Sequence, residues 1–339
     1  MEKCLVTKLN GAVNNNDLLR IGECVVGVES SAADELLFQV DLGNTKYYCE
    51  QSHKSGEEIV SAGSKKQLVS WTDLKSTSAG LYRFHFLSKY YIKGLLEKST
   101  NGSNEVKQLN YLNNVSQVSL NTKSEYALYE LKQSTLLKIL MLKGNVTGDI
   151  SSLSNMTALT QLSINSNNVT GDISSLSNMT ALTQLSINSN NVTGDISSLS
   201  NMTALKNVEG TLTITGKVEN LKVFPNLVKF NCTNATEKDN FGDIATLPAS
   251  FTYLFIGSNA SISWSSRPST SKIIGVLGSP KLSNIDKMLQ DQAQCVIGIT
   301  SSTPEYEKSI TATGTRTSAS DAAVQTLQSK GYTVSITPA

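Results

Sequence analysis

The feature that most constrains the fold is a tandem repeat in the middle of the chain. Residues 145–167 read NVTGDISSLSNMTALTQLSINSN, and residues 168–190 repeat them without a single change. A third copy begins at Asn191 and matches through Leu205. A fixed period of 23 residues, in which each copy is too short to bury a core of its own, predicts coils that stack on one another.

Each copy places apolar residues at the spacing of a short strand that ends in a turn. In the first copy Leu159-xx-Leu162-x-Ile164 precedes Asn167, and the second copy repeats this arrangement. The spacing resembles the LxxLxLxxN consensus of leucine-rich repeat proteins, whose repeats are roughly 20–29 residues long. The resemblance implies an α+β, mainly β fold, a solenoid whose strands form a parallel sheet. Leucine should pack on leucine, and the turn asparagines should form a ladder of amides.

Weaker copies of the pattern flank the identical ones, so we predict a solenoid over residues 115–280. Its inward-facing positions are Val115, Val118 and Leu120; Leu136, Ile139 and Met141; Leu227, Phe230 and Cys232; Phe251, Leu254 and Ile256; and Ile274 and Val276. The stretch around Leu212 and Ile214 fits the pattern poorly and is predicted to form an irregular coil. Cys232 is therefore interpreted as a core residue and not as a nucleophile.

Low charge is the second unusual property of the chain. Charged residues are 17% of the total, and 29 basic against 28 acidic side chains leave a net charge of +1. Nucleic-acid-binding proteins present a basic face, so no nucleic-acid partner is expected. Stacked identical coils explain the low charge, because each repeated charge would lie against its own copy. We expect no membrane span, because the chain has no apolar run of about 18 residues, and no secretory leader after Met1.

The N-terminal region does not share the repeat. Residues 1–93 alternate apolar and polar positions and predict a small, mostly antiparallel β domain. Its predicted strands cover residues 4–9, 19–28, 35–42 and 81–92. Residues 94–114 are rich in Asn, Lys and Ser and are interpreted as a linker or as a cap at the start of the solenoid.

The C-terminal region, residues 281–339, predicts a small α+β cap on the open end of the solenoid. An amphipathic helix is expected to place Ile285, Met288 and Leu289 on one side. The predicted helices cover residues 282–294 and 319–329, and the predicted strands cover residues 295–299, 309–313 and 332–336. Gly331 suits the end of the second helix.

Two short stretches at the ends carry a second resemblance. Leucine-rich proteins of Bacteroides-type bacteria and their tailed phages have pieces similar to the start, MEKCLVTKLNG…LLRIGE, and to the ending, DAAVQTLQSKGYTVSI. The resemblance implies a component of a cell surface or of a virion. Because no leader is seen, a phage structural protein that is released by lysis is favoured over a lipoprotein-type adhesin.

Residue types that carry catalysis are scarce in this chain. His53 and His85 are the only candidate imidazole bases, and we interpret the first as a loop residue and the second as a strand residue. The sequence has no GxSxG, phosphate-loop, HExxH or GxGxxG motif, and its five cysteines form no CxxC pair. We therefore predict no catalytic residue, no cofactor and no metal site, and we do not expect an enzyme.

One acidic position recurs in the repeat. Asp149, Asp172 and Asp195 occupy the same point of successive coils, where stacked carboxylates would repel and a cation could relieve the repulsion. The favoured interpretation is a turn whose aspartate caps backbone amides. Calcium-binding solenoids carry several carboxylates per coil, whereas each copy here has one.

The side chains that alternate with the core residues face outward and form the predicted binding face. In the identical coils they are Gln161, Ser163, Asn165, Gln184, Ser186 and Asn188. In the flanking coils they are Lys138, Leu140, Leu142, Tyr253 and Phe255. Exposed apolar and aromatic groups mark a contact surface. The alternative is that a flanking domain covers them.

These observations favour a non-enzymatic recognition protein. The leading hypothesis is a phage virion component, a fibre or decoration protein, whose solenoid binds a host-surface glycan or protein. Its N-terminal domain would dock to other virion proteins or to a second copy of itself. The alternative is a bacterial leucine-rich repeat adhesin at the cell surface. A third hypothesis, a glycan-active enzyme, requires a carboxylate pair in the N-terminal domain.

Overall fold

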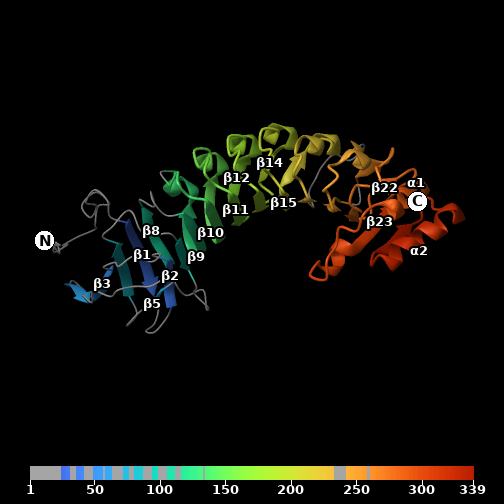
Figure 1. Cartoon of the computed structure of the whole chain (residues 1–339). Helices are drawn as coiled ribbons and strands as arrows, with labels where there is room; N and C mark the ends of the chain where they lie inside the picture. Colours follow the sequence, from blue (N-terminus) through green and yellow to red (C-terminus); the bar gives the residue numbers. More distant parts are fainter. Residues whose placement is uncertain are drawn as a thin grey trace. The chain divides into compact units, whose positions relative to one another are not determined.

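A computed structural model shows a mainly β protein that divides into two units, Met1–Gln161 and Leu162–Ala339. Each unit is described by itself, and both are drawn in Figure 1. The structure describes residues 24–30, 36–41, 49–55, 58–62, 72–75, 80–86, 94–97, 105–110, 116–132, 134–232, 242–257 and 260–339. Prediction and structure can therefore be compared over most of the repeat and over the whole C-terminal region.

Five strands of the first unit form an antiparallel sheet. β1 (Cys24–Ser30) lies between β6 (Gly80–Phe86) and β8 (Glu105–Asn110). β3 (Cys49–Ser55) pairs with the other side of β6, and β4 (Glu58–Ala62) pairs with β3 and forms one edge of the sheet. Antiparallel pairing agrees with the alternation of apolar and polar residues in this region.

A second sheet of the first unit joins the N-terminal strands to the first coils. β2 (Leu36–Asp41) pairs antiparallel with β5 (Thr72–Lys75) and with β7 (Gly94–Glu97). β7 also runs parallel to β9 (Gln117–Ala127), which in turn runs parallel to β10 (Ile139–Asp149). The N-terminal strands therefore cover an edge of the parallel sheet that would otherwise leave backbone groups unpaired.

The N-terminal strand predictions were partly right. β2 confirms the strand predicted over residues 35–42, β1 overlaps 19–28, and β6 fills the start of 81–92. The strand predicted over residues 4–9 lies outside the described residues. His53, which we predicted on a loop, lies in β3, and that interpretation was wrong. The stretch 94–114 contains β7 and β8, whereas the domain boundaries themselves stay a prediction.

The coil that contains β10 has a register one residue away from the predicted one. Leu140 and Leu142 are 0% and 2% exposed, although we predicted both as outward-facing, and the supposedly inward Met141 is 38% exposed. The stretch alternates two apolar sets, and a shift of one residue exchanges the two faces of a strand. The fully buried Leu137, and not the exposed Leu136, begins the LxxLxL pattern of this coil.

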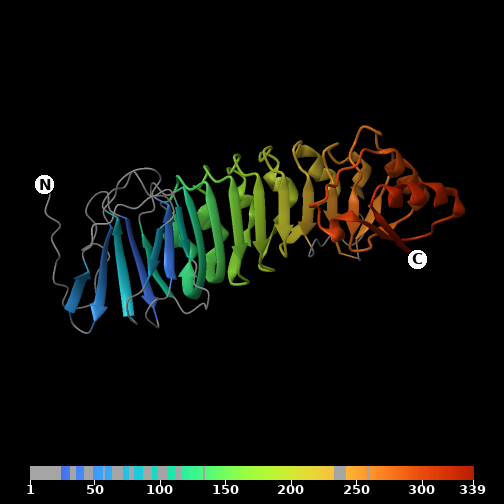
Figure 2. The ribbon, with the colours of Figure 1, turned by 60° about the horizontal axis from the view of Figure 1, so that its bottom comes forward.

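The coils that contain β11, β13, β15 and β17 share the same three elements, whereas the coil that contains β19 and β20 has no 3₁₀ helix. In one of the identical coils, β13 (Gln184–Asn188) is followed by the short strand β14 (Val192–Asp195) and by the 3₁₀ helix η4 (Ile196–Leu199). β13 points Leu185 and Ile187 inward and pairs in parallel with the strand of the next coil. Figure 2 shows the strands of these coils side by side.

The remaining coil elements follow this order. They are β11 (Gln161–Asn165), β12 (Val169–Asp172), η3 (Ile173–Leu176), β15 (Asn207–Gly210), β16 (Thr213–Thr215), η5 (Val218–Val223), β17 (Lys229–Cys232), β18 (Gly242–Asp243), η6 (Ile244–Thr246), β19 (Tyr253–Phe255), β20 (Ser261–Ser263), β21 (Gly275–Leu277) and β22 (Lys281–Leu282), with η1 (Leu128–Leu131) and η2 (Ile150–Leu153) in the first unit. Leu212 and Ile214 are buried in a coil that has β15, β16 and η5 in the usual order. The prediction of an irregular coil there was wrong.

The inward side chains of the second unit stack into a continuous apolar core. Equivalent positions in successive paired strands are Leu185, Val208, Phe230, Leu254 and Val276. These coils are therefore 22 to 24 residues long, and all five side chains are buried. Burial of each contributes about 1.5–3 kcal/mol, and neighbouring coils supply much of the contact. Burial confirms the inward positions predicted at Val118, Leu120, Leu227, Phe230, Cys232, Phe251, Leu254, Ile256, Ile274 and Val276.

Serine, and not asparagine, makes the buried hydrogen bond at the turn between identical coils. Ser189 is fully buried, and its Oγ donates a hydrogen bond of 2.6 Å to the carbonyl oxygen of Val169 in the preceding coil. The consensus Asn167 and Asn190 are exposed, so an amide ladder at these two positions stays a prediction. One residue further on, Asn191 Nδ2 donates 2.7 Å to the carbonyl oxygen of Asn167 at the surface.

The repeated aspartates cap the 3₁₀ helices that follow them. Asp149 Oδ1 accepts from the N–H of Ser151, two residues later, at 2.8 Å. Asp172 and Asp195 make the same bond at 2.8 and 2.7 Å. These bonds confirm the capping interpretation.

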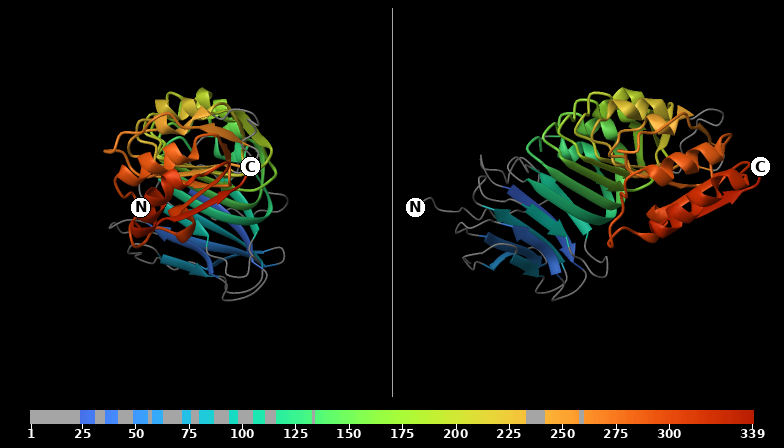
Figure 3. Two further views of the ribbon diagram at one scale, coloured as in Figure 1. Left: turned by 90° about the vertical axis from the view of Figure 1, so that its right-hand side faces the viewer. Right: turned by 45° about the vertical axis from the view of Figure 1, so that its right-hand side comes forward.

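The C-terminal region continues the same parallel sheet instead of ending it. α1 (Ile285–Gln294) and η7 (Glu305–Lys308) precede β23 (Ser309–Thr313), which pairs in parallel with β21. After η8 (Ser318–Ser320) and α2 (Asp321–Ser329), β24 (Thr333–Thr337) pairs in parallel with β23. The region thus consists of two larger coils in which α-helices replace the 3₁₀ helices. Figure 3 shows both helices beside these strands.

Most of the C-terminal predictions were right. Both helices and the strands over 309–313 and 332–336 are confirmed within one to three residues at each end, and Ile285, Met288 and Leu289 are buried. Gly331 has a φ of 88°, as expected for a residue that ends a helix. The strand predicted over residues 295–299 was wrong, because this stretch makes only a single bridge, between Val296 and Lys272.

A buried arginine joins two of the C-terminal loops. Arg267 is 4% exposed, and its guanidinium donates to the carbonyl oxygens of Ala245, Leu247, Pro248 and Lys272 at 3.0–3.3 Å. Burial lowers the pKa of this group from its ordinary value. These carbonyl groups belong to no strand and therefore have no strand partner. The Arg267 guanidinium supplies the hydrogen-bond donors that a neighbouring strand would otherwise provide.

Candidate binding face

The outward side chains of four paired strands form one continuous surface of the second unit. Two rows cross β13, β15, β17 and β19. The first row is Gln184, Asn207, Lys229 and Tyr253, and the second is Ser186, Glu209, Asn231 and Phe255. We call these eight residues the candidate face. Along both rows, amide and hydroxyl groups give way to charged and aromatic groups.

The predicted outward residues of the identical coils lie on the outside. Ser163, Asn165, Gln184, Ser186 and Asn188 are half-buried or exposed in the second unit, as are Lys138 and Gln161 in the first. Leu140 and Leu142 are inside the core and belong to no surface. A binding role for the outward residues stays a prediction.

Tyr253 faces outward, as predicted, but another part of the same unit covers it. It is 2% exposed, and the ring of Tyr306 lies edge-on against it with 5.9 Å between the ring centroids. Burial raises the pKa of Tyr253 above its ordinary value, and the nearby Tyr306, Glu307 and Glu209 raise it further. The cover is the segment 296–308, which connects α1 to β23 and which we call the crossing segment.

Two glycines let the crossing segment lie against the coils. A Cβ on Gly275 of β21 would lie 2.3 Å from the carbonyl oxygen of Glu307, so no other residue fits there without movement. A Cβ on Gly298 would lie 2.8 Å from Cγ2 of Thr252. An ion pair holds the far end of the segment, because Lys229 Nζ lies 2.6 Å from Glu307 Oε1, whose side chain is 9% exposed.

The crossing segment and the starting edge of the strands line a half-open cavity of about 460 Å³ with a mixed polar and apolar wall. Its lining residues are Val228, Lys229, Ser250, Thr252, Lys272, Gly298, Ile299, Ser302, Thr303, Pro304 and Glu307. The lining contains two ammonium groups and one carboxylate, with hydroxyl groups between them. The volume lies within the range of about 300–1,000 Å³ that is usual for small-molecule sites.

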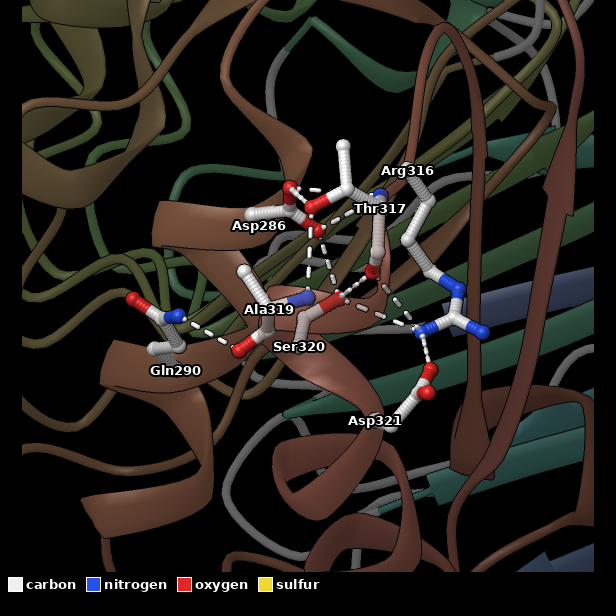
Figure 4. Close-up of polar contacts among 7 residues, drawn as sticks. All are labelled: Asp286, Gln290, Arg316, Thr317, Ala319, Ser320 and Asp321. Atoms are coloured by element: carbon white, nitrogen blue, oxygen red, sulfur yellow. Dashed lines mark hydrogen bonds and ion pairs between the residues drawn. The ribbon is translucent and has the colours of Figure 1, made fainter.

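A second polar cluster, shown in Figure 4, connects α1 to the start of α2. Asp286 accepts hydrogen bonds from the hydroxyls of Ser320 and Thr317, both at 2.6 Å, and from the Thr317 N–H. Arg316 lies 2.6 Å from Asp321. The Ser320 and Thr317 hydroxyls lower the pKa of Asp286. The cluster holds a serine beside an aspartate but no histidine, so it lacks the base of a Ser–His–Asp triad and acts as a clasp between two helices.

The buried Cys232 thiol is a poor nucleophile, and the described residues offer no cluster of metal ligands. Cys232 is fully buried, and burial together with the Glu209 carboxylate raises the pKa of its thiol, which disfavours the nucleophilic thiolate. Among the described residues, no three His, Cys, Asp or Glu side chains lie close enough together to hold a metal ion.

No helix in the described part of the chain is long and apolar enough to cross a membrane.

Comparison with known proteins gives structural matches but no sequence matches. No family description and no curated protein matches the chain. An internalin from Listeria monocytogenes is 16% identical over 73% of this chain and 82% of its own, with a TM-score of 0.39. A leucine-rich repeat protein from Leptospira interrogans is 12% identical over 64% of this chain and 59% of its own, with a TM-score of 0.40. The leucine-rich ectodomain of the Arabidopsis receptor kinase HAESA, solved with a peptide hormone, is 20% identical over 51% of this chain, with a TM-score of 0.39, and the chain spans 35% of that ectodomain.

The coil itself shows which fold this is. Successive coils each contribute one strand to a parallel sheet and bury residues at the LxxLxL spacing, and all of them except the coil with β19 and β20 return through a short 3₁₀ or α-helix. The fold is a leucine-rich repeat solenoid. Coils of this type occur in both units, and the leucine-rich repeat pattern continues through the C-terminal helices to β24.

The crossing segment is the part of the candidate site that the leucine-rich repeat pattern did not reveal. Its sequence, VIGITSSTPEYEK, has no periodicity, and the prediction assigned its start to a strand. One signal was present in the sequence. Gly275 occupies an outward strand position that carries a side chain in the preceding coils, and such a glycine indicates close approach of another chain segment.

Proposed function

We propose that this protein is a non-catalytic recognition protein that binds a partner through the candidate face. The observation that carries the proposal is the contrast between the two sides of the same strands. Inward positions stay apolar from β13 to β19, whereas outward positions change from Gln184 and Ser186 to Lys229 and Phe255. A rigid scaffold with variable outward side chains supports selective binding.

The divergent coils supply the selective part of the candidate face. The identical coils repeat the same glutamine, serine and asparagine, so they offer the same groups at every step. Glu209, Asn231 and Phe255 each occur once in their row and remain partly accessible. A host-surface glycan or protein is the partner class that we propose, because amide, hydroxyl and charged groups bind sugars and polar protein surfaces alike.

We further propose that the chain is a virion component whose N-terminal strands attach it to the particle. The support for this step is the resemblance of its two terminal stretches to pieces of leucine-rich proteins of Bacteroides-type bacteria and their phages. If the proposal is right, mass spectrometry of purified phage particles should detect the chain. Its absence from particles, together with its presence on intact bacterial cells, would favour the alternative of a surface adhesin.

The experiment that tests recognition is a binding assay of the full chain with purified host envelopes. Phe255→Ser removes an outward aromatic ring from the candidate face, and we expect it to weaken binding by about tenfold or more. Val223→Ser is the matched control, because Val223 is 40% exposed on η5, away from the strands. Equal binding by both variants would refute the candidate face. Cleavage of envelope polysaccharide by the chain would refute the non-catalytic assignment.

A further inference from the structure

The cavity beside the crossing segment is lined by more positive than negative side chains. Glu307 already pairs with Lys229 at 2.6 Å, and its side chain is 9% exposed. Lys272 lines the same cavity, and among the described residues it has no acidic partner. The lining therefore holds one positive charge that its own carboxylate does not neutralise.

The hydroxyl groups of the cavity wall are arranged to accept hydrogen bonds. Ser250 Oγ and Thr252 Oγ1 donate to the carbonyl oxygens of Leu227 and Val228 in the preceding coil, both at 3.3 Å. Thr303 Oγ1 accepts from the N–H of Thr300 at 2.8 Å. Because the first two hydroxyl protons are committed to the protein, their lone pairs are left for donors on a ligand.

The lining also excludes several kinds of ligand. It contains no aromatic ring, so it offers no platform on which an uncharged sugar ring could stack. Only Val228, Ile299 and Pro304 are apolar, so a lipid chain would leave the lysines unsatisfied. Position 298 leaves no room for a side chain in this wall, because a Cβ there would lie 2.8 Å from Cγ2 of Thr252 and 3.3 Å from Cδ of Lys272.

We propose that this cavity binds one acidic sugar residue, with Lys272 on its carboxylate and the Ser250 and Thr252 hydroxyls accepting from its ring hydroxyls. The ligand class combines one negative charge with several hydroxyl donors and matches both the charge and the acceptors of the lining. The volume of about 460 Å³ is large for a single carboxylate side chain of a peptide and leaves room for a six-membered sugar together with water. This proposal rests on the recognition function and names the group that the divergent coils would select.

The test is calorimetric titration of the full chain with D-glucuronate, with D-glucose as the uncharged probe and with the capped dipeptide Asp-Glu as the acidic peptide probe. Glucuronate should bind at least about tenfold more tightly than either of the other two, because a charge-assisted hydrogen bond contributes enough for that ratio. A disaccharide that ends in glucuronate separates two sources of the ligand. Tighter binding of the disaccharide points to a glycan chain end, and equal binding points to a free monosaccharide.

Three variants make the assignment specific. Lys272→Met should weaken glucuronate binding by about tenfold or more, and Lys272→Arg should retain most of it. Lys222→Met is the matched control, because it removes the same charge from the exposed surface of η5 and should leave binding unchanged. Gly298→Val places a side chain against Thr252 and the stem of Lys272, which changes the shape of the wall without changing its charge, and it should also weaken binding while the circular dichroism stays that of the wild type.

Several results would overturn the proposal: no glucuronate binding below about 10 mM, equal binding of glucose, preferred binding of the dipeptide, or an unchanged Lys272→Met variant. The two proposals fail separately. If Phe255→Ser abolishes envelope binding while glucuronate does not bind, only the cavity assignment is wrong. If glucuronate binds as described while Phe255→Ser has no effect on envelope binding, the candidate face is wrong and the cavity site remains.

Discussion

The identical coils and the divergent coils of the second unit share a core but differ in almost everything else. The identical coils bury the same leucine, isoleucine, valine and methionine at every step and expose the same small polar groups. The divergent coils from β15 to β21 keep the buried positions but add charged and aromatic residues, a buried arginine and a crossing segment. The coils can therefore stack through their buried residues alone, whereas the proposed selective binding depends on outward side chains that differ from coil to coil.

The two kinds of coil are also stabilised in different ways. An identical coil repeats the bonds of its neighbour, so the loss of one bond leaves equivalent bonds elsewhere. A divergent coil depends on contacts that occur once, such as the Arg267 guanidinium and the absent side chain of Gly210.

Arg267→Met should cause the largest loss of stability. The substitution removes the donor to the carbonyl oxygens of Ala245, Leu247 and Lys272 and one of two donors to that of Pro248, and each unsatisfied buried polar group costs about 1–3 kcal/mol. We expect the free energy of unfolding in urea to fall by at least about 3 kcal/mol. Arg316→Met, which breaks an exposed ion pair with Asp321, is the control and should cost less than about 1 kcal/mol. Similar losses in both variants would contradict a special role for Arg267.

Gly210→Ala should come next. Gly210 pairs with Ile187 of the identical coil, but it has a φ of 137°, and a Cβ there would lie 1.9 Å from the Ile187 carbonyl oxygen. Because both the backbone and the strand pairing must shift, we expect a loss of more than about 2 kcal/mol in urea unfolding. Ile187→Val should cost about 0.5–1.5 kcal/mol. If Gly210→Ala is the milder variant, the divergent coil is more adaptable than we infer.

Ser189→Ala tests which residue type links the identical coils. It removes the 2.6 Å bond to Val169 and leaves a buried carbonyl oxygen with one partner fewer, so we expect a loss of about 1 kcal/mol in thermal or urea unfolding. Ser200→Ala, at an exposed position of the same coil, is the control and should change little. A larger loss of unfolding free energy for Asn190→Ala than for Ser189→Ala would support the asparagine ladder that the consensus predicts.

The Asp286 clasp should weaken in acid. Because the Ser320 and Thr317 hydroxyls lower the pKa of Asp286, its contribution is complete above the ordinary aspartate pKa and is lost as pH falls through the lowered value. Hydrogen exchange of the α2 amides should accelerate over this range in the wild type, whereas Asp286→Asn should be fast already at neutral pH. The amides of the identical coils serve as an internal control. An unchanged α2 at low pH would argue against the clasp.

Deletion of residues 168–190 should have the smallest effect. It joins Asn167 to Asn191, a junction with the same sequence as the present ones, so every contact between identical coils is made again. We expect a cooperative unfolding transition and only a small shift in the midpoint by circular dichroism. Deletion of residues 208–229 removes one divergent coil and should prevent cooperative folding. A molten product from the first deletion would refute independent stacking of the repeats.

Much of the fold could be predicted because the core positions obey a strict spacing. Leu162, Ile164, Leu185 and Ile187 are all buried, as the LxxLxL pattern requires, and the α1 and α2 helices follow from their amphipathic sequences. The error at Leu140 has a clear cause. Leu136 and Leu137 are both leucines, and the two faces of β10 are both apolar in sequence, so only packing could decide between them.

The candidate site was less predictable than the fold, because its key contacts join residues far apart in sequence. Tyr253 lies on the outer side of its strand, but it is 2% exposed because Tyr306, 53 positions further along the chain, packs against it. Lys229 and Glu307 are 78 positions apart. The crossing segment has no periodic signal, and neither charge alone marks a site. Repetition therefore made the scaffold predictable, whereas unrepeated residues with long-range contacts required the structure.

Because the junctions between the identical copies are the same, the stack can gain or lose whole copies, each with an equal rise. Every inserted or deleted copy changes the length of the stack by one strand spacing, about 4.8 Å. The cavity and the divergent half of the candidate face lie entirely C-terminal to the copies, so such a change would not alter their chemistry. An added or removed copy would thus change the number of coils in front of the divergent ones while leaving the residues of the divergent coils as they are.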